Sequence, residues 1–284
     1  MPTIYISDLD GTLLRSDATL SAFSKSTLDG LLAEGILFTV ASARSVTSIR
    51  PILDGLTLPL PIIEFNGAFI TDLGTGRHAI INDIDRDLAE GIFDVIRKSG
   101  SLPFVSTYDG TADRVYYEKI LNDGMQQHLN NRRASHDPRL RKIDRLADAF
   151  SDRVVCLTVI DRSEVVVKVR KAIEEAYPDQ AEMHFYEDTY APGWSWLTVN
   201  DLKATKGRAI QTLTRLAGLD DGEVVAFGDH TNDIEMFRVA HRSFAVANAK
   251  DELKTRATGT IGSNEEDSVI RFIQADCRER TPAG

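Results

Sequence analysis

The sequence predicts an α/β protein with a parallel sheet covered by helices, into which a second, mixed α+β domain is inserted. Near both ends of the chain, short apolar runs alternate with stretches of helical periodicity, which is typical of a parallel sheet with helical crossovers. Between residues 83 and 190, candidate strands instead follow one another in pairs, which indicates an antiparallel sheet. The predicted domains are therefore 1–82 with 191–284, and the inserted 83–190.

The first domain is expected to begin with alternating strands and helices. The apolar run Thr3–Ile6 predicts a strand, and Ser21–Glu34 has apolar residues at helical spacing until Gly35 ends the helix. Strands connected through helices in this way run parallel. The elements expected in this domain are strands at 3–6, 36–41, 61–63, 196–199, 224–227, 243–246 and 258–261, a hairpin at 66–76, and helices at 21–34, 45–53, 205–218, 233–240 and 266–275.

The inserted domain is expected to combine helices with neighbouring strands. The expected helices are at 85–99, 118–133 and 163–177, and the expected strands are near 103–107, 114–117, 154–160 and 182–186. Pairs of strands next to one another favour an antiparallel sheet.

The composition narrows the possible partners. A chain of 284 residues is long enough for two hydrophobic cores. Its formal net charge of −10 disfavours nucleic acid and anionic membranes, and no apolar stretch approaches the ~18 residues that a transmembrane helix requires. The first residues lack the basic segment of a signal peptide, and Cys156 and Cys277 have no metal-binding or redox spacing. We therefore expect a cytoplasmic protein whose partner is a small molecule.

Carboxylates follow two of the predicted strands. Asp8 and Asp10 come after the first strand, and Asp229 and Asp233 follow the strand at 224–227. The carboxyl ends of parallel strands meet at one edge of the sheet, where α/β folds bind ligands. One such cluster is equally well explained as a surface turn, because Asp-Gly is ordinary turn chemistry. Two clusters with the same architecture predict a single site.

Two further positions complete the predicted site. Ser42 lies where the second strand ends and a helix begins, so its hydroxyl and nearby N–H groups can contact a phosphate. Lys206 opens the helix before the strand at 224–227. Alone, the serine would be a helix cap and the lysine a surface residue, so the inference depends on the whole set. Up to four clustered carboxylates need cations, which Mg²⁺ and Lys206 can supply, and a phosphate dianion is the natural substrate.

These residues together resemble the four sequence motifs of the haloacid dehalogenase superfamily. The motifs are Asp8-x-Asp10-Gly11-Thr12, Ser42, Lys206 and Gly228-Asp229-x-x-Asn232-Asp233. The intervening length and the segments 66–68, 248–249 and 263–267 are similar to the Cof-type (subclass IIB) sugar phosphatases of that superfamily. The resemblance covers the whole chain and implies a Rossmann-like core, with residues 83–190 as a cap that closes over the substrate and excludes water.

The resemblance also implies a role for each motif residue. Asp8 would be the nucleophile that forms an aspartyl-phosphate, and Asp10 would protonate the leaving alcohol and then activate water. Mg²⁺ would be bound by Asp8, the Asp10 backbone carbonyl and Asp229, with Asp233 as a ligand or a support. The phosphoryl group would be held by Ser42, Lys206, Asn232 and Thr12. The expected substrate contacts are Arg44, Asn66, Arg114 and Asn264.

The expected function is a Mg²⁺-dependent phosphatase for small phosphorylated metabolites, with sugar phosphates as the expected class. A phosphosugar mutase on the same scaffold is the alternative enzyme. A phospho-aspartate signalling protein also clusters Asp, a hydroxyl and Lys, but such receivers are about one domain long and have no place for the insertion. Dehalogenases of this superfamily need neither a metal nor the second Asp of the first motif, so Asp10 argues against dehalogenation.

Overall fold

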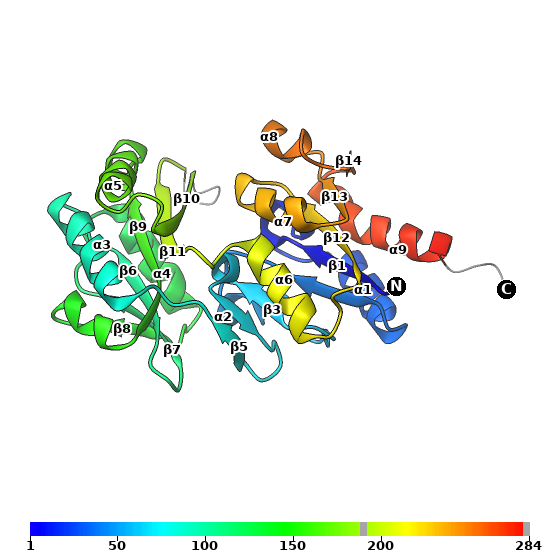
Figure 1. Ribbon diagram of the computed structural model, residues 1–284, viewed down its shortest axis with the longest axis horizontal. Helices are drawn as coiled ribbons and strands as arrows, with labels where there is room; N and C mark the ends of the chain where they lie inside the picture. Colours follow the sequence, from blue (N-terminus) through cyan, green and yellow to red (C-terminus); the bar gives the residue numbers. More distant parts are fainter. Residues whose placement is uncertain (188–191, 281–284) are drawn as a thin grey trace. The chain divides into compact units, whose positions relative to one another are not determined.

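The computed structural model describes residues 1–187 and 192–280, which form two compact units (Figure 1). Unit 1 comprises Met1–Ile80 and Ala204–Gly284, and unit 2 comprises Ile81–Lys203. Each unit has its own sheet and its own hydrophobic core. The predicted α/β fold, with a parallel sheet and a separate, largely antiparallel one, is confirmed.

Unit 1 is built on a five-stranded parallel sheet in the order β14-β13-β12-β1-β2. Its strands are β1 (Thr3–Ser7), β2 (Leu37–Val40), β12 (Glu223–Gly228), β13 (Arg242–Ala245) and β14 (Gly259–Thr260). In the register of the sheet, Ser7 at the end of β1 lies beside Phe227 of β12 and Val40 of β2. The residues that follow these three strands therefore meet at the same edge of the sheet.

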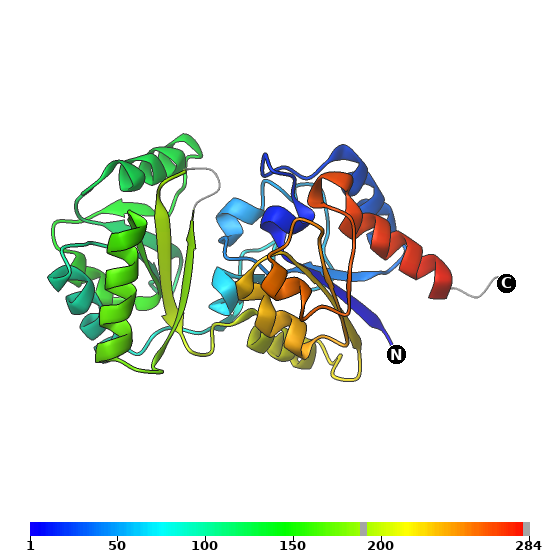
Figure 2. The same cartoon turned by 90° about the horizontal axis from the view of Figure 1, so that it is seen from above.

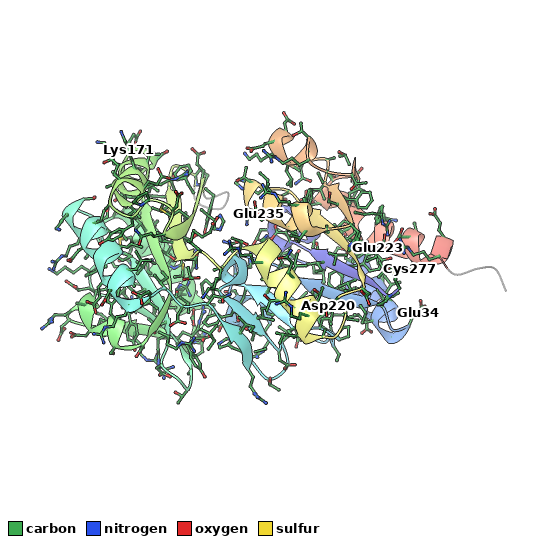
Figure 3. The ribbon with its side chains drawn as sticks, viewed as in Figure 1. Glu34, Lys171, Asp220, Glu223, Glu235 and Cys277 are labelled. Carbon is green, nitrogen blue, oxygen red and sulfur yellow. The ribbon has the colours of Figure 1, made fainter. Side chains whose placement is uncertain are left out.

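Helices cover both faces of this sheet. α1 (Ala22–Ala33) and α9 (Ser268–Arg280) lie together on one face, and α6 (Lys206–Leu216) and α7 (Ile234–Val239) lie on the other (Figure 2). α7 carries Glu235 (Figure 3) and packs on α6 at Gly207, where an added Cβ would lie 2.4 Å from the Glu235 carbonyl oxygen. Only glycine permits this approach, which fixes the start of α6 beside α7.

A polar network ties α9 to Tyr5 within β1 and to the first residues of β12 and β13. The Tyr5 hydroxyl in β1 donates to Asp276 at 2.7 Å. Arg242 of β13 donates to both oxygens of Asp276, each at 2.8 Å, and to Glu223 at 2.7 Å. Glu223, labelled in Figure 3, also pairs with Arg280 at 2.6 Å. The first strand and the last described helix are thereby joined.

A small three-stranded sheet extends unit 1 beyond β2. It contains β3 (Ile62–Glu64), β4 (Phe69–Thr71) and β5 (His78–Ile81), in agreement with the expected strand and hairpin. A parallel bridge between Ala41 and Ile63 joins β3 to the end of β2. The loop after β2 therefore lies directly beside the end of β3.

Unit 2 has a six-stranded sheet in the order β10-β11-β9-β6-β7-β8. The strands are β6 (Phe104–Tyr108), β7 (Asp113–Tyr117), β8 (Leu140–Lys142), β9 (Arg153–Asp161), β10 (Ala181–Glu187) and β11 (Ser195–Asp201). All pairs are antiparallel except β7 with β8. α3 (Arg86–Lys98) and α5 (Ser163–Ala176) pack together against one core, while Met125 and Leu129 of α4 (Asp123–Ala134) pack in a second.

The return to unit 1 comes later than the predicted boundary at residue 191. The sequence predicts the strand at 196–199 as part of the first domain, but it is β11 of unit 2. It pairs antiparallel with both β9 and β10, so that Trp196 lies opposite Ile160 and Tyr186. A short apolar run suits the interior of either sheet, and only its pairing partners decide between them.

The helices are short. α2 (Val46–Ile49) covers only part of the expected helix 45–53, and Pro51 lies just beyond its end, where a helix cannot easily continue. The longest helix of residues 1–187 and 192–280 is α5, with 14 residues. No helix in these ranges is long and apolar enough to cross a membrane.

Candidate active site

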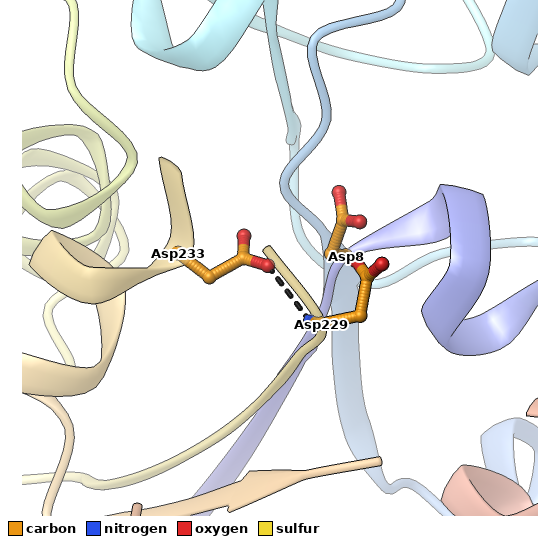
Figure 4. Close-up of side chains that lie close together, drawn as sticks. All are labelled: Asp8, Asp229 and Asp233. Carbon is orange, nitrogen blue, oxygen red and sulfur yellow. Dashed lines mark hydrogen bonds between the residues drawn. The ribbon is translucent and has the colours of Figure 1, made fainter. Parts of the chain in front are cut away.

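Three aspartates meet at the carboxyl edge of the parallel sheet (Figure 4). Asp8 directly follows β1, Asp229 directly follows β12, and Asp233 precedes α7. Each residue offers one carboxylate oxygen, and these oxygens all lie within 4.8 Å of one another. Asp8 and Asp233 are buried, and Asp229 is partly buried. The two predicted acidic clusters thus form one group.

Glycines allow the backbone to approach these carboxylates. Gly11 has φ +73°, a conformation that L side chains rarely adopt, and an added Cβ would lie 2.5 Å from Asp229 Oδ2. At Gly228 an added Cβ would lie 2.6 Å from Asp233 Oδ2. Any larger residue at either position would displace a carboxylate of the cluster.

Lys206 is the cation of this site. Its side chain is fully buried, and Nζ lies 2.6 Å from Asp8 Oδ1 and 2.6 Å from Asp233 Oδ1. The other oxygen of Asp233 accepts the backbone N–H groups of Asp229 at 3.0 Å and His230 at 3.1 Å. Asp233 therefore orients both Lys206 and the loop that carries Asp229.

The cluster carries more negative than positive charge. With all groups ionised, three carboxylates face one ammonium, which leaves two negative charges. Burial raises the pKa of Asp8 to about 7, with Lys206 opposing the shift and Asp233 adding to it. Burial and the neighbouring carboxylates of Asp8 and Asp233 raise the pKa of Asp229 to about 8. Although burial acts against it, Asp233 and Asp8 hold the pKa of Lys206 above its usual value.

These residues fit a divalent cation. Mg²⁺ prefers hard oxygen ligands and commonly uses one or two carboxylates together with water and substrate phosphate. A divalent charge would balance the two excess negative charges and would lower the carboxylate pKa values that burial and mutual repulsion raise. The Thr12 hydroxyl donates to Asp229 Oδ1 at 3.1 Å, so Thr12 orients a candidate metal ligand.

The Asp10 side chain is not part of the three-aspartate group. Both of its oxygens accept from Arg44, Oδ2 from Nε at 2.7 Å and Oδ1 from Nη2 at 2.6 Å. This bidentate geometry is the strongest common pairing of a carboxylate with arginine. Arg44, predicted as a substrate contact, is thus a partner of the predicted acid and base. The 34-residue separation of Asp10 and Arg44 along the chain does not reveal this pair.

Hydrogen bonds connect the loops that carry the predicted phosphate ligands. Ser42 follows β2 and is buried, and its Oγ accepts the N–H of Arg44 at 3.1 Å. The N–H of Asn66 donates to the Ser42 carbonyl at 2.9 Å. The Asn66 side-chain oxygen accepts from Asn232 Nδ2 at 3.1 Å. The loops after β2, β3 and β12 are therefore linked in series.

Asn264, predicted as a substrate contact, supports the backbone after β1. Its Nδ2 donates to the Leu14 carbonyl at 2.9 Å, and its N–H donates to Asn248 Oδ1 at 3.0 Å. Asn248 in turn donates to the Gly11 carbonyl at 2.7 Å. Asn248 was not predicted as a site residue, although its place just after β13, at the same sheet edge, is a usable signal.

Arg114 lies in β7 of unit 2. Its Nη2 is 2.7 Å from Asp109 Oδ2, and its Nη1 donates to the Asp113 carbonyl at 3.0 Å. Arg114 therefore has partners within its own unit, and its predicted role in substrate binding stays a prediction.

Known proteins resemble this chain along nearly its whole length. A family model described as haloacid dehalogenase-like hydrolase matches residues 5–273. The chain is 26% identical over 281 residues to the 5-amino-6-(5-phospho-D-ribitylamino)uracil phosphatase YitU of Bacillus subtilis, covering 96% of this chain and 97% of that protein. It is 28% identical over 283 residues to the B. subtilis phosphatase YwtE, which is named for the same substrate. That alignment covers 94% of this chain and 95% of YwtE. A solved haloacid dehalogenase-like hydrolase from Bacteroides thetaiotaomicron shares the fold, with a TM-score of 0.79 and 20% identity. The match covers 97% of this chain and 100% of that chain.

Proposed function

Because this chain belongs to the haloacid dehalogenase-like hydrolases, and to their Cof type, we propose that it is a Mg²⁺-dependent phosphatase that hydrolyses small phosphorylated metabolites. The family places the enzyme among the phosphoric monoester hydrolases. One observation supports the proposed chemistry most strongly: a fully buried lysine bridges Asp8 and Asp233 within a group of three carboxylates. Such a cluster suits a cation and a phosphate dianion together.

In the proposed mechanism, Asp8 is the nucleophile. Its carboxylate oxygen forms a bond to phosphorus while the bond between phosphorus and the ester oxygen breaks. Lys206 donates to Asp8 Oδ1, so rotation of the carboxylate is restricted and the attacking oxygen is held in place. The product of this step is an aspartyl-phosphate and a free alcohol.

Asp10 is the proposed general acid and base. It gives its proton to the departing alcohol oxygen, and in the second step it takes a proton from the water that attacks the aspartyl-phosphate. Phosphate is released, Asp8 is regenerated and Asp10 is protonated again. In this structure both Asp10 oxygens accept from Arg44, so one of these two hydrogen bonds has to open before Asp10 can carry the proton, while the other keeps the side chain oriented.

Asp8, Asp229 and Asp233 are the side chains that would hold the metal or support it. When bound, Mg²⁺ would offset the charge that develops on the transferring phosphoryl oxygens. We assign Ser42 and Asn232 to the phosphoryl oxygens, with Lys206 as the cation that neutralises them. Unit 2, Ile81–Lys203, is proposed as the cap that contacts the leaving group.

The proposed substrates are small phosphate monoesters, with sugar phosphates as the first class to test. Two relatives are named for 5-amino-6-(5-phospho-D-ribitylamino)uracil, a ribityl phosphate, so that compound belongs in the panel. A phosphosugar mutase would return the phosphoryl group to the sugar, whereas a phosphatase gives it to water. Free phosphate and sugar isomers should therefore be measured in the same reactions.

The decisive experiment is release of free phosphate from such a panel with Mg²⁺, comparing the wild type with Asp8→Asn. The amide is nearly isosteric with the carboxylate but is a poor nucleophile, so turnover should be abolished while the melting temperature stays similar. Steady-state activity of Asp8→Asn, with deamidation excluded by mass spectrometry, would contradict the proposed nucleophile. Isomer formation without free phosphate would favour the mutase.

A further inference from the structure

Glu64, at the end of β3, is a buried carboxylate that the proposed chemistry does not use. Its side chain is fully buried within unit 1. A buried ionised group is costly unless hydrogen bonds and opposite charge compensate it, so its partners show what it contributes.

Both Glu64 oxygens accept hydrogen bonds. Oε2 accepts the backbone N–H of Val46, the first residue of α2. Oε1 accepts the hydroxyl of Thr71 in β4, and His78 Nδ1 of β5 lies 3.6 Å from the same oxygen. The side chain therefore joins the start of α2 to the β4–β5 hairpin.

The hydroxyl of Thr71 sets the direction of this chain of hydrogen bonds. Because its single proton goes to Glu64, its oxygen must accept from His78 Nδ1, which lies 2.7 Å away. His78 is itself held by stacking on Phe69, with ring centroids 4.0 Å apart and an interplanar angle of 8°. His78 thus donates to Thr71 and Thr71 donates to Glu64, two hydrogen bonds that reinforce one another, while the Val46 N–H donates to the other Glu64 oxygen.

Val46 ends the segment that carries Ser42, which we call the 42–46 loop. Three backbone hydrogen bonds bind this loop to the chain around Glu64. Ser42 N–H donates to the Ile63 carbonyl at 2.9 Å, and the Phe65 N–H donates to the Arg44 carbonyl at 3.1 Å. The third is the bond from Asn66 N–H to the Ser42 carbonyl at 2.9 Å. Glu64 lies in the middle of this seam and adds a side-chain bond to it, from the Val46 N–H to its carboxylate.

The seam holds the backbone after β3 in an unusual conformation. Phe65 has φ 48° and Asn66 has φ 56°, two consecutive left-handed residues that are not glycine. Such residues persist only when surrounding contacts hold them. Asn66 then accepts from Asn232 at 3.1 Å, so the same seam reaches the loop after β12.

We propose that Glu64 is a positioning residue for phosphoryl binding, and that the hydrogen bonds from His78 to Thr71 and from Thr71 to Glu64 orient its carboxylate. It acts by fixing the N–H of Val46 and hence the 42–46 loop, and it touches no substrate. The inference rests on the proposed function, because Ser42 and Asn232 are taken as phosphoryl contacts. The new element is a set of buried residues, Glu64, Thr71 and His78, that acts through these two phosphoryl contacts.

Two substitutions at Glu64 separate positioning from folding. Glu64→Leu removes the acceptor and leaves the Val46 N–H without a partner. Glu64→Gln keeps one carbonyl oxygen for Val46, and its amide can donate to Thr71 if the chain of hydrogen bonds reverses. The matched control is Thr39→Val, which removes a buried hydroxyl that donates to the Pro61 carbonyl at 2.6 Å, outside the 42–46 loop.

The readouts are the inhibition constants of orthovanadate and inorganic phosphate, KM and kcat with p-nitrophenyl phosphate, the half-saturating Mg²⁺ concentration and the melting temperature. For Glu64→Leu we expect the inhibition constants and KM to rise about tenfold or more, as the loss of a buried polar partner implies. For Glu64→Gln they should stay within about threefold of wild type, and for Thr39→Val they should be unchanged. Half-saturating Mg²⁺ should be the same in all variants.

Unchanged inhibition constants in Glu64→Leu, whatever its melting temperature, would overturn the positioning role. If Glu64→Leu does not fold, Thr71→Val decides, because it removes the hydroxyl that orients Glu64 and is nearly isosteric. For Thr71→Val we expect the inhibition constants and KM to rise about threefold, and unchanged inhibition constants would overturn the proposal. A wild-type enzyme that hydrolyses no phosphomonoester would instead overturn the proposed function, and the positioning role with it.

Discussion

Replacing Lys206 with methionine tests the charge balance of the active site directly. Lys206 is the cation in contact with Asp8 and Asp233, 2.6 Å from one oxygen of each. Methionine has a similar length but no charge, so the excess at the cluster rises from two negative charges to three. Breaking a buried ion pair by removing one partner costs on the order of 3–5 kcal/mol, because the remaining charge is left uncompensated. The melting temperature without metal should therefore fall.

The effect on catalysis should be uniform across substrates. Removing one preorganised group that stabilises transition-state charge costs roughly 10²–10³ in rate, or about 3–4 kcal/mol. Every substrate shares the phosphoryl group, so kcat/KM for p-nitrophenyl phosphate and for each sugar phosphate should fall by a similar factor in Lys206→Met. The assay is initial-rate phosphate release at saturating Mg²⁺. The control is Lys171→Met, which removes an exposed lysine of unit 2 (Figure 3). It should change neither the melting temperature nor kcat/KM.

A second substitution separates charge balance from catalysis. Lys206→Met with Asp233→Asn returns the excess to two negative charges, so the melting temperature should recover at least in part. Activity should not recover, because the cation that contacts Asp8 is still absent. The reasoning would be refuted if Lys206→Met changed only the preference among sugars. It would equally be refuted if the double variant regained wild-type kcat/KM.

Four other predictions follow from the site. Asp10→Asn should lose more activity on sugar phosphates than on p-nitrophenyl phosphate, since that leaving group needs little protonation; equal losses would argue against a general acid. The raised pKa values of Asp8 and Asp229, about 7 and 8, give the metal-free protein stability that is fully present below about pH 4 and lost as pH rises through 7 and 8. In EDTA the melting temperature should therefore fall from pH 6 to 9, while the increase caused by Mg²⁺ should grow; a flat response would contradict these shifts. Gly11→Ala should weaken Mg²⁺ activation at least tenfold, because its Cβ would meet Asp229, and half-saturating Mg²⁺ measures this. Arg114→Ala should alter the ranking of sugar phosphates but keep the aryl phosphate rate within about tenfold; a uniform loss would contradict a role in leaving-group recognition.

The sequence could predict those parts of the site that depend on strand ends. Asp8 and Asp229 directly follow apolar runs, so their meeting at one sheet edge follows from the parallel order of β1 and β12. Lys206 could be placed because the helix it opens precedes β12. In each case, local pattern and topology together determine the position of the side chain.

Long-range side-chain pairing was not predictable in the same way. Asp10 and Arg44 are 34 residues apart, and nothing in their spacing shows that they form a bidentate pair. Asn264 could be identified as a polar residue near the site, but its bond to the Leu14 carbonyl depends on how two loops meet. The assignment of β11 to the wrong unit has the same origin, since an apolar run does not specify its partner strands.

Unit 1 is assembled from two segments that are far apart in the chain, and this affects how it can form during synthesis. β1 lies between β2 and β12, so one of its edges stays unpaired until residues near 223 have been made. At about 5–20 residues per second, that interval lasts on the order of 10–40 s after β2. Throughout this time the apolar residues of β1 lie on an open edge, which favours association with other chains.

Unit 2, in contrast, is one continuous segment whose sheet is complete once β11 has been made. The order of synthesis therefore favours unit 2 folding first, and limited proteolysis of stalled nascent chains would show whether it is protected before unit 1. Asp8 lies 198 residues before Lys206, so the ion pair at the centre of the site cannot form in any chain that stops within unit 2. The tie between β1 and α9 through Tyr5 and Asp276 comes later still, which makes closure of the first strand against the last helix one of the final steps in the maturation of the enzyme.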